Sequence, residues 1–314
     1  MAANRLILLA ALLGLCCLGY MTLGARGSWS FVLPFRGTKL AALLIVGAAI
    51  STATVLFQTL TTNRILTPSI MGFDALYMLI LVVAVYFLGG QGYIQLPAAM
   101  VFLVNVAAMT GAALLLFGTL LGSAQGDLMR MILTGIIFGT LFRSLSSFLT
   151  RMIDPNEFTF IQVGSFAQFN RVNTDLLTIG GGLLLLTLGL VWRMRARLDV
   201  IALGRDAAVG LGVDHRVEQI KILILISVLV SVSTALVGPV AFLGLLVVSL
   251  AHLITPSARH AVILPSAALI AAITLIGGQA VLERVFKLST PLSAVIDLFG
   301  GALFLFLLLR GTRK

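Results

Sequence analysis

Charged residues are scarce in this chain of 314 residues. Asp, Glu, Lys and Arg make up 10% of the sequence, whereas about a quarter of the residues in a soluble protein carry charge. Hydrophobic residues make up 60% and the mean hydropathy is +1.12. The 21 Lys and Arg outnumber the 11 Asp and Glu, but they are scattered between apolar runs instead of forming one basic face. The composition excludes a soluble domain and does not favour nucleic-acid binding.

Motifs for nucleotide and metal chemistry are also missing. A P-loop requires Lys followed by Ser or Thr after a glycine-rich turn, and this holds for none of the four lysines: Lys39, Lys221, Lys287 and Lys314. The three histidines show neither the HExxH pattern nor another tight ligand spacing: His215, His252 and His260. No paired carboxylates, and no nucleophile with its base, have a spacing typical of an intramembrane enzyme. We therefore expect no enzymatic activity, no metal site and no bound cofactor in this chain.

Cysteine is limited to two adjacent residues, Cys16 and Cys17. Adjacent cysteines inside an apolar run cannot crosslink distant segments, so we interpret both as packing residues. Arg5 precedes this run, as in a secretory signal, but no small-residue cleavage pattern follows it. Leu15 stands where a lipoprotein signal has a small residue. The first apolar run is therefore expected to be a retained helix.

Long apolar runs make up most of the sequence. Crossing about 30 Å of hydrocarbon takes roughly 20 apolar residues in a helix, and continuous runs favour helices over the alternating strands of a barrel. Breaks at glycine, proline and polar residues give ten segments: 4–23, 39–58, 74–88, 96–117, 128–150, 174–194, 218–237, 240–255, 261–283 and 291–310. We predict an all-α membrane protein, a polytopic bundle of about ten transmembrane helices in a single domain, 1–314.

The breaks between these segments have recognisable compositions. Three turns are predicted at clusters of glycine, proline and polar residues, namely 89–92, 122–126 and 154–156. The segment 240–255 is short and directly follows a Gly-Pro pair. We therefore expect this helix to be bent or to cross only part of the membrane.

The positions of the basic residues orient the bundle. With ten helices and a cytoplasmic N-terminus, 13 of the 21 Lys and Arg fall on the cytoplasmic side, and six of these lie between Arg193 and Lys221. We predict that both termini and the loop 196–217 face the cytoplasm. Within this loop, 206–211 can form a short helix between Gly204 and Gly212. The loop is either a solvated basic segment that sets the topology or a docking element for another protein.

Carboxylates within the apolar segments are few. Asp74 and Asp297 lie at or inside predicted helices, and Glu283 lies near a helix end beside Arg284. Embedded carboxylates can load and release protons, so a proton-coupled secondary transporter stays open as an alternative. The simpler interpretation is that these groups lie at helix ends or interfaces.

Four blocks of sequence, in compatible order and spacing, carry a family resemblance. The first is 36–72, with matching positions Gln58, Asn63, Pro68 and Gly72 and departures at Arg64 and Met71. The second, LGRDAAVGLGV, matches an LGxxxAxxLG pattern at Leu203, Gly204, Ala208, Leu211 and Gly212. The third, GPVAFLGL, matches GPxxFxGL at Gly238, Pro239, Phe242, Gly244 and Leu245. The fourth is the terminal stretch 283–310, in which STPLS replaces the usual ELPVG.

These blocks resemble the permease subunits of bacterial ABC importers for ferric siderophores, haem and vitamin B12, and the siderophore-type branch in particular. The resemblance implies a multi-pass permease of the bacterial inner (cytoplasmic) membrane that translocates a ferric siderophore. It implies as partners ABC ATPase subunits that use the ATP, a second permease, expected to be a paralogue forming a heterodimer, and a periplasmic substrate-binding protein. Haem or vitamin B12 as cargo stays an alternative.

The resemblance also implies roles for residues. Coupling to the ATPase is expected at Leu203, Gly204, Ala208, Leu211 and Gly212. Docking of the binding protein is expected at Arg36 and Lys39, with a second docking position at Arg284 and Lys287. The other matched residues belong to family motifs along the translocation pathway: Gln58, Asn63, Pro68, Gly72, Gly238, Pro239, Phe242 and Gly244.

Overall fold

The structure is a computed structural model that describes residues 2–24, 28–123, 128–286 and 290–311. These residues form helices and turns, with no strand among them. The α-helices are α1 (Ala2–Thr22), α2 (Trp29–Thr61), α3 (Phe73–Gln95), α4 (Ala98–Ser123), α5 (Leu128–Thr150), α6 (Phe158–Gly164), α7 (Thr174–Ile201), α8 (Arg205–Gly210), α9 (His215–Val237), α10 (Leu243–Ile254), α11 (His260–Ala280) and α12 (Leu292–Gly311). The shorter turns are η1 (Pro68–Met71), η2 (Pro155–Glu157), η3 (Phe169–Arg171) and the π-helical η4 (Val281–Val285).

Ten of these helices coincide with the ten predicted apolar segments. Eight are long and apolar enough to cross a membrane, and α10 and α12 are shorter apolar helices. With 12 residues, α10 is only about 18 Å long, as expected for the short segment 240–255. The predicted all-α membrane fold is confirmed.

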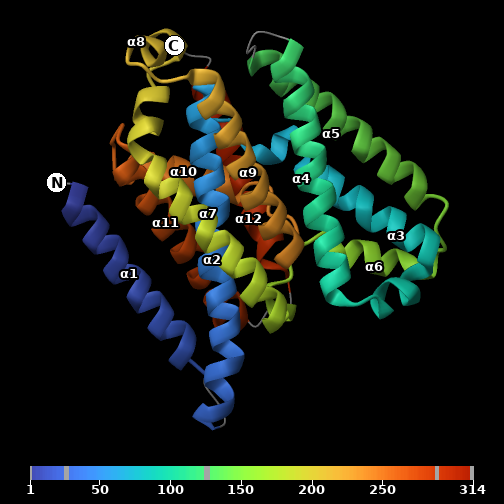
Figure 1. The fold of residues 1–314 in the computed structure, drawn as a ribbon. Helices are drawn as coiled ribbons and strands as arrows, with labels where there is room; N and C mark the ends of the chain where they lie inside the picture. Colours follow the sequence, from blue (N-terminus) through green and yellow to red (C-terminus); the bar gives the residue numbers. More distant parts are fainter. Residues whose placement is uncertain (1, 25–27, 124–127, 287–289, 312–314) are drawn as a thin grey trace.

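The helix α2 lies at the centre of the bundle, where it packs against α7, α9, α10 and α11 (Figure 1). Within its apolar span 67% of the residues are buried, compared with 6% for α1, which lies at the periphery. The helices α3, α4, α5 and α6 form a second group on the side away from α1 (Figure 1). Exposed leucines on α1, such as Leu8 and Leu15, suit a surface that faces lipid.

The bundle has two distinct ends (Figure 1). The α8 end contains α8, the last turns of α2, α7 and α10, and the first turns of α1, α9 and α11; there Arg5 Nη1 donates to Ile254 O at 2.7 Å. The Arg36 end contains the last turn of α1 and the first turns of α2 and α7. At this end Arg36 donates to backbone carbonyls that follow α1.

The structure corrects several predicted helix ends and adds one helix. The helix α2 begins at Trp29 instead of residue 39, and α7 ends at Ile201 instead of residue 194. The predicted break at the glycines 89–92 is present, because Gly89 has non-helical dihedral angles (φ 70°, ψ 162°), but a further helical stretch of α3 follows it and continues to Gln95. A side chain at Gly90 would overlap the ring of Phe160 in α6, so the glycine is required for α6 to pack beside the kink. The sequence did not reveal α6, because seven residues are too few for a recognisable periodic pattern.

The other predicted turns have different outcomes. The turn at 154–156 is confirmed, because Asp154 Oδ1 accepts a hydrogen bond from Asn156 N at 2.8 Å. The predicted turn at 122–126 lies mostly outside the described residues. The predicted short helix 206–211 is present as α8, which begins and ends one residue earlier.

Candidate coupling segment and transport cleft

The helix α8 presents apolar side chains at its end of the bundle. Gly204 and Gly212 have φ of 94° and 78°, values that favour glycine, and they turn the chain into and out of α8. Ala208 is fully buried, and its amide donates to Gly204 O at 3.0 Å. Leu203 and Leu211 are 64% and 63% exposed. The five predicted coupling residues therefore comprise two turn glycines, one inward anchor and two outward leucines, an arrangement that suits contact with a partner.

Charged groups tie α7 to α9, the two helices that precede and follow α8. Glu218, whose side chain is 6% exposed, accepts hydrogen bonds from Arg197 Nη1 and Lys221 Nζ, both at 2.8 Å. Asp214 caps α9 by accepting from Val217 N at 3.1 Å. Charge-assisted bonds and satisfied helix ends hold a backbone in place, so the exposed leucines are presented from a firm support.

Arg36, which the sequence analysis predicted as a docking residue, lies in a buried environment. Its side chain is buried, with 7% of the residue exposed. Nη1 donates to the carbonyls of Tyr20, Met21 and Leu23 at 2.8–3.0 Å, and Nη2 donates to Gly24 O at 3.0 Å. These carbonyls lie at the C-terminal end of α1, where intrahelical partners are missing and a cation is favoured. The guanidinium therefore ties α1 to α2.

The other predicted docking cations that the structure describes, Lys39 and Arg284, are both partly exposed. Lys39 is partly exposed; its Nζ donates to Asn170 Oδ1 at 3.1 Å and lies 4.4 Å from the centre of the Phe35 ring. Arg284 is also partly exposed, and its Nη1 lies 3.4 Å from Gly24 O. Lys287 lies outside the described residues. Lys39 and Arg284 thus present partly exposed charge at the Arg36 end.

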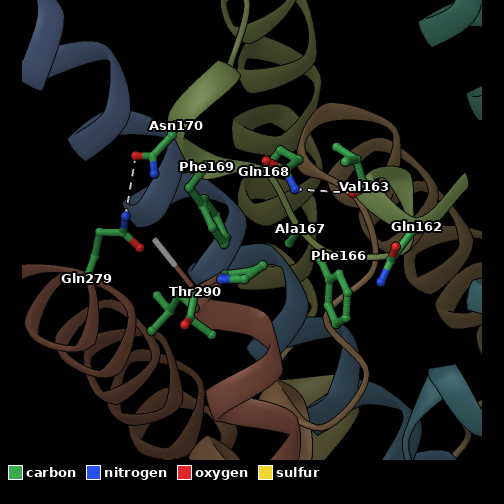
Figure 2. Close-up of a pocket in the computed structure, with 11 residues that line it drawn as sticks. Gln162, Val163, Phe166, Ala167, Gln168, Phe169, Asn170, Gln279 and Thr290 are labelled. Atoms are coloured by element: carbon green, nitrogen blue, oxygen red, sulfur yellow. Dashed lines mark hydrogen bonds between the residues drawn. The ribbon is translucent and has the colours of Figure 1, made fainter. Parts of the chain in front are cut away.

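Figure 2 shows a small pocket of about 300 Å³, and Asn170 in its wall is the residue to which Lys39 donates. Gln279 Nε2 donates to Asn170 Oδ1 at 3.3 Å and to Glu283 Oε1 at 2.6 Å, and Gln168 Nε2 donates to Val163 O at 3.1 Å. Because Asn170 also accepts from Lys39, the pocket and the cation share one hydrogen-bond network. Amide and apolar side chains form most of its wall: Gln162, Val163, Phe166, Ala167, Gln168, Phe169, Asn170, Gln279, Thr290, Pro291 and Leu292.

The first-block residues organise the connection between α2 and α3. Gln58 is buried and its Nε2 donates to Arg64 O at 2.7 Å, while the exposed Asn63 accepts from Ile65 N at 3.0 Å. Pro68 is the buried first residue of η1. Gly72 has φ of 92°, and a Cβ there would lie 2.7 Å from Gly139 Cα in α5. These four residues shape a loop and a close helix crossing.

The third-block residues form the break between α9 and α10. Gly238 has φ of 98°, and a Cβ there would lie 3.1 Å from Phe166 O. Gly244 is buried directly against the side chain of Thr54 in α2. Phe242 N donates to Asp297 Oδ1 of α12 at 3.1 Å, which satisfies an amide at the start of α10. This block joins α2, α10 and α12.

A larger cleft of about 790 Å³ lies between α3, α5, α6, α12 and the residues that precede α10. Its polar wall includes two acidic and two basic side chains: Asp74, Asp297, Arg143 and Arg151. Of the eight predicted pathway residues, Pro239 contributes to the wall of this cleft, and the other seven occupy the loop and packing positions above. Among the described residues, no group of three His, Cys, Asp or Glu lies close enough to hold a metal ion.

Arg143 and Arg151 are the site residues that the sequence analysis missed. Both were counted there only among the basic residues that orient the bundle in the membrane. A recognisable signal was present for Arg143, because a charge within the apolar segment 128–150 is costly in lipid and typically faces an interior or a water-filled space. The cleft itself required the tertiary structure, since five separate segments form its wall.

Comparison with known proteins places this arrangement in a family. The model of the FecCD transport family matches residues 5–310. The chain belongs to the FecCD transport family. Among its FecCD relatives, the petrobactin import system permease protein YclO of Bacillus subtilis (strain 168) is 43% identical over 308 residues, 98% of each chain. The petrobactin import system permease protein FatC of Bacillus anthracis is 34% identical over 88% of this chain and 78% of its own.

A solved structure has the same fold. A chain from a metal-chelate type ABC transporter in an inward-facing conformation has a TM-score of 0.84 and 22% identity, covering 98% of this FecCD chain and 99% of its own. The family predicted from the four blocks is confirmed, and the haem and vitamin B12 permeases are more distant relatives, at 26% and 28% identity. The chain is therefore a transport permease and a multi-pass membrane protein.

Proposed function

We propose that this FecCD protein is one permease subunit of an ABC importer that translocates a ferric siderophore across the bacterial cytoplasmic membrane. The exposed leucines that flank α8, Leu203 and Leu211, carry the proposal, because they form an apolar surface at one end of the bundle. The names of the petrobactin permease relatives support a siderophore as the cargo. The siderophore keeps its own iron coordinated, so the permease needs no metal site or cofactor.

In this proposal ATP is bound and hydrolysed by separate ATPase subunits seated on α8, and both termini lie on that cytoplasmic side. A second permease, expected to be a paralogue, completes the pathway along the 790 Å³ cleft. The Arg143 and Arg151 guanidinium groups in the cleft wall are candidate hydrogen-bond donors to the oxygen atoms of a bulky chelate, and Asp74 and Asp297 of the same wall balance their charge.

The periplasmic binding protein would dock at the Arg36 end. Lys39, Arg284 and Lys287 are the candidate contacts for its acidic residues, whereas Arg36 supports the surface from below. Rim charges of this kind mainly set association rate and register and weaken with salt. Docking through these cations should therefore weaken as the salt concentration rises.

The coupling role is tested by replacing the two exposed leucines that flank α8. The double variant Leu203→Ser and Leu211→Ser should lose copurification of the ATPase subunit, because it removes the apolar contact while leaving the turn glycines and Ala208 in place. The matched control is Leu253→Ser, since Leu253 is 74% exposed at the same end of the bundle but belongs to α10 and not to the segment 203–212. If the double variant retains the ATPase as well as the control does, α8 is not the contact.

The cargo is tested by uptake into proteoliposomes that contain the full transporter. A ferric siderophore should be imported in preference to haem and vitamin B12, and Arg143→Gln should lower import by about tenfold or more, the effect of losing ~1.4 kcal/mol. Leu298→Gln provides a control substitution on an exposed apolar residue of α12. Preferential import of haem or vitamin B12 would favour the alternative cargo.

A further inference from the structure

A three-residue hydrogen-bond network connects three helices at the α8 end. Asp199 in the last turns of α7 accepts hydrogen bonds from the backbone N and the Nδ1 of His260, both at 2.7 Å. His260 is the first residue of α11 and is 3% exposed, and its Nε2 lies 2.8 Å from the hydroxyl of Thr59 in α2. We propose that Asp199, His260 and Thr59 are positioning residues that carry the movement of α8 into α2 and α11.

The link from α8 to Asp199 is short and hydrogen-bonded. The turn between α7 and α8 is closed by Ala202 N to Leu198 O at 3.0 Å, Leu203 N to Val200 O at 3.1 Å and Gly204 N to Ile201 O at 3.0 Å. Asp199 lies within this same turn of chain. Because these hydrogen bonds fix the turn, a displacement of α8 should also displace the Asp199 carboxylate.

The link from Asp199 to α11 is an end cap supplied by another helix. The first amides of a helix have no intrahelical acceptor and carry partial positive charge, and the Asp199 carboxylate occupies this position in α11. It also holds the imidazole through Nδ1. One carboxylate thus fixes both the start of α11 and the orientation of the ring.

The link from His260 to α2 depends on a single hydroxyl. Thr59 Oγ1 lies 2.8 Å from both His260 Nε2 and Val55 O. A hydroxyl has one proton to donate. Either Nε2 and Val55 O compete for this proton, or the hydroxyl donates to Val55 O and accepts a proton from Nε2. Any movement of the ring therefore perturbs a backbone group of the central helix.

The helix α2 continues this path toward the cleft. Five residues before Thr59, Thr54 packs directly against Gly244 of α10. The start of α10 is held by Asp297, which lines the cleft. The network thus connects through the backbone of α2 to contacts that reach the cleft wall, and the inference rests on the proposed transport function.

The experiment measures ATP hydrolysed per siderophore imported by the complete transporter in proteoliposomes. Thr59→Val removes the hydroxyl with little change in shape, and Asp199→Ala removes the carboxylate. Both should keep ATP hydrolysis and raise the ratio at least about fivefold, the lower end of common coupling factors. Thr59→Ser, which keeps the hydroxyl, and Asp175→Ala, which changes an exposed carboxylate at the other end of α7, should keep the wild-type ratio.

The outcomes distinguish a failure of the proposed network of Asp199, His260 and Thr59, here called the relay, from a failure of the proposed transport function. An unchanged ratio in Thr59→Val, or the same change in Thr59→Ser, overturns the relay while wild-type import upholds the proposed function. Parallel loss of hydrolysis and import at a constant ratio also overturns it. If Asp199→Ala does not assemble, Thr59→Val decides alone. A wild-type complex that hydrolyses ATP without importing any siderophore contradicts the proposed function itself.

Discussion

Replacing Arg36 should destabilise the bundle, because this side chain ties α1 to α2. The variant Arg36→Gln keeps a polar side chain but loses the charge and most of the donors that reach four carbonyl groups. Each hydrogen bond to a charged group contributes about 1.5–3 kcal/mol, but the four contacts share two nitrogen atoms and do not add. We therefore expect a loss of about 3–5 kcal/mol, similar to breaking a buried ion pair.

The assay is the thermal midpoint of the detergent-purified protein. A loss of 3–5 kcal/mol should lower the midpoint by about 6–10 °C, at roughly 2 °C per kcal/mol for a chain of this size. The control is Lys39→Ala, one turn along α2, which removes a partly exposed cation and should cost less than about 1 kcal/mol. Arg36→Lys should recover part of the loss, because an ammonium group has three donors and keeps the charge.

This prediction also separates a tie between helices from a docking contact. Folded Arg36→Gln should bind the substrate-binding protein with the salt dependence of the wild type, whereas Lys39→Ala should reduce that dependence. A wild-type midpoint for Arg36→Gln, together with weaker and less salt-dependent binding, would refute the reasoning from burial. The Arg36 charge would then act on the partner.

Three further substitutions test other parts of the structure. Gly72→Ala should destabilise the protein by about 3 kcal/mol, because a side chain at φ of 92° would also press on Gly139; Gly111→Ala, with open space around it, should be neutral in the same thermal assay. Glu218→Gln should cost about 1–2 kcal/mol, because two cations lose their shared carboxylate, and a wild-type midpoint would contradict this. Asp297→Ala should lower import at normal protein levels, because the start of α10 loses its acceptor; unchanged uptake would show that import does not depend on this contact.

The helices could be predicted from the sequence because membrane thickness sets the length of a span. Each predicted apolar segment corresponds to a helix, and the predicted turn at Asp154 is present. Both features depend on local composition. The glycines 89–92 marked the break at Gly89, but the sequence did not show that a further helical stretch follows it to Gln95. Glycine there serves the close approach of Phe160 from α6 and a kink at Gly89, and sequence alone does not distinguish a glycine that ends a helix from one that admits a neighbour.

The candidate site could be predicted only in part. The α8 segment was recognisable, because its turn glycines, buried alanine and exposed leucines are close in sequence. The cleft was not, because Arg143 and Asp297 come from helices far apart in the chain. The network of Asp199, His260 and Thr59 was missed for the same reason, since its members are separated by 61 and 201 positions.

The sequence by itself determined that this is an all-helical membrane protein of the FecCD family, because apolar run length and short motifs are local properties of a chain. Only the tertiary structure decided which of its charges are available to a partner. Arg36 and Lys39 are three positions apart on α2, yet the end of α1 covers the first and leaves the second partly exposed. Burial depends on where a distant segment packs, and no local pattern specifies that position.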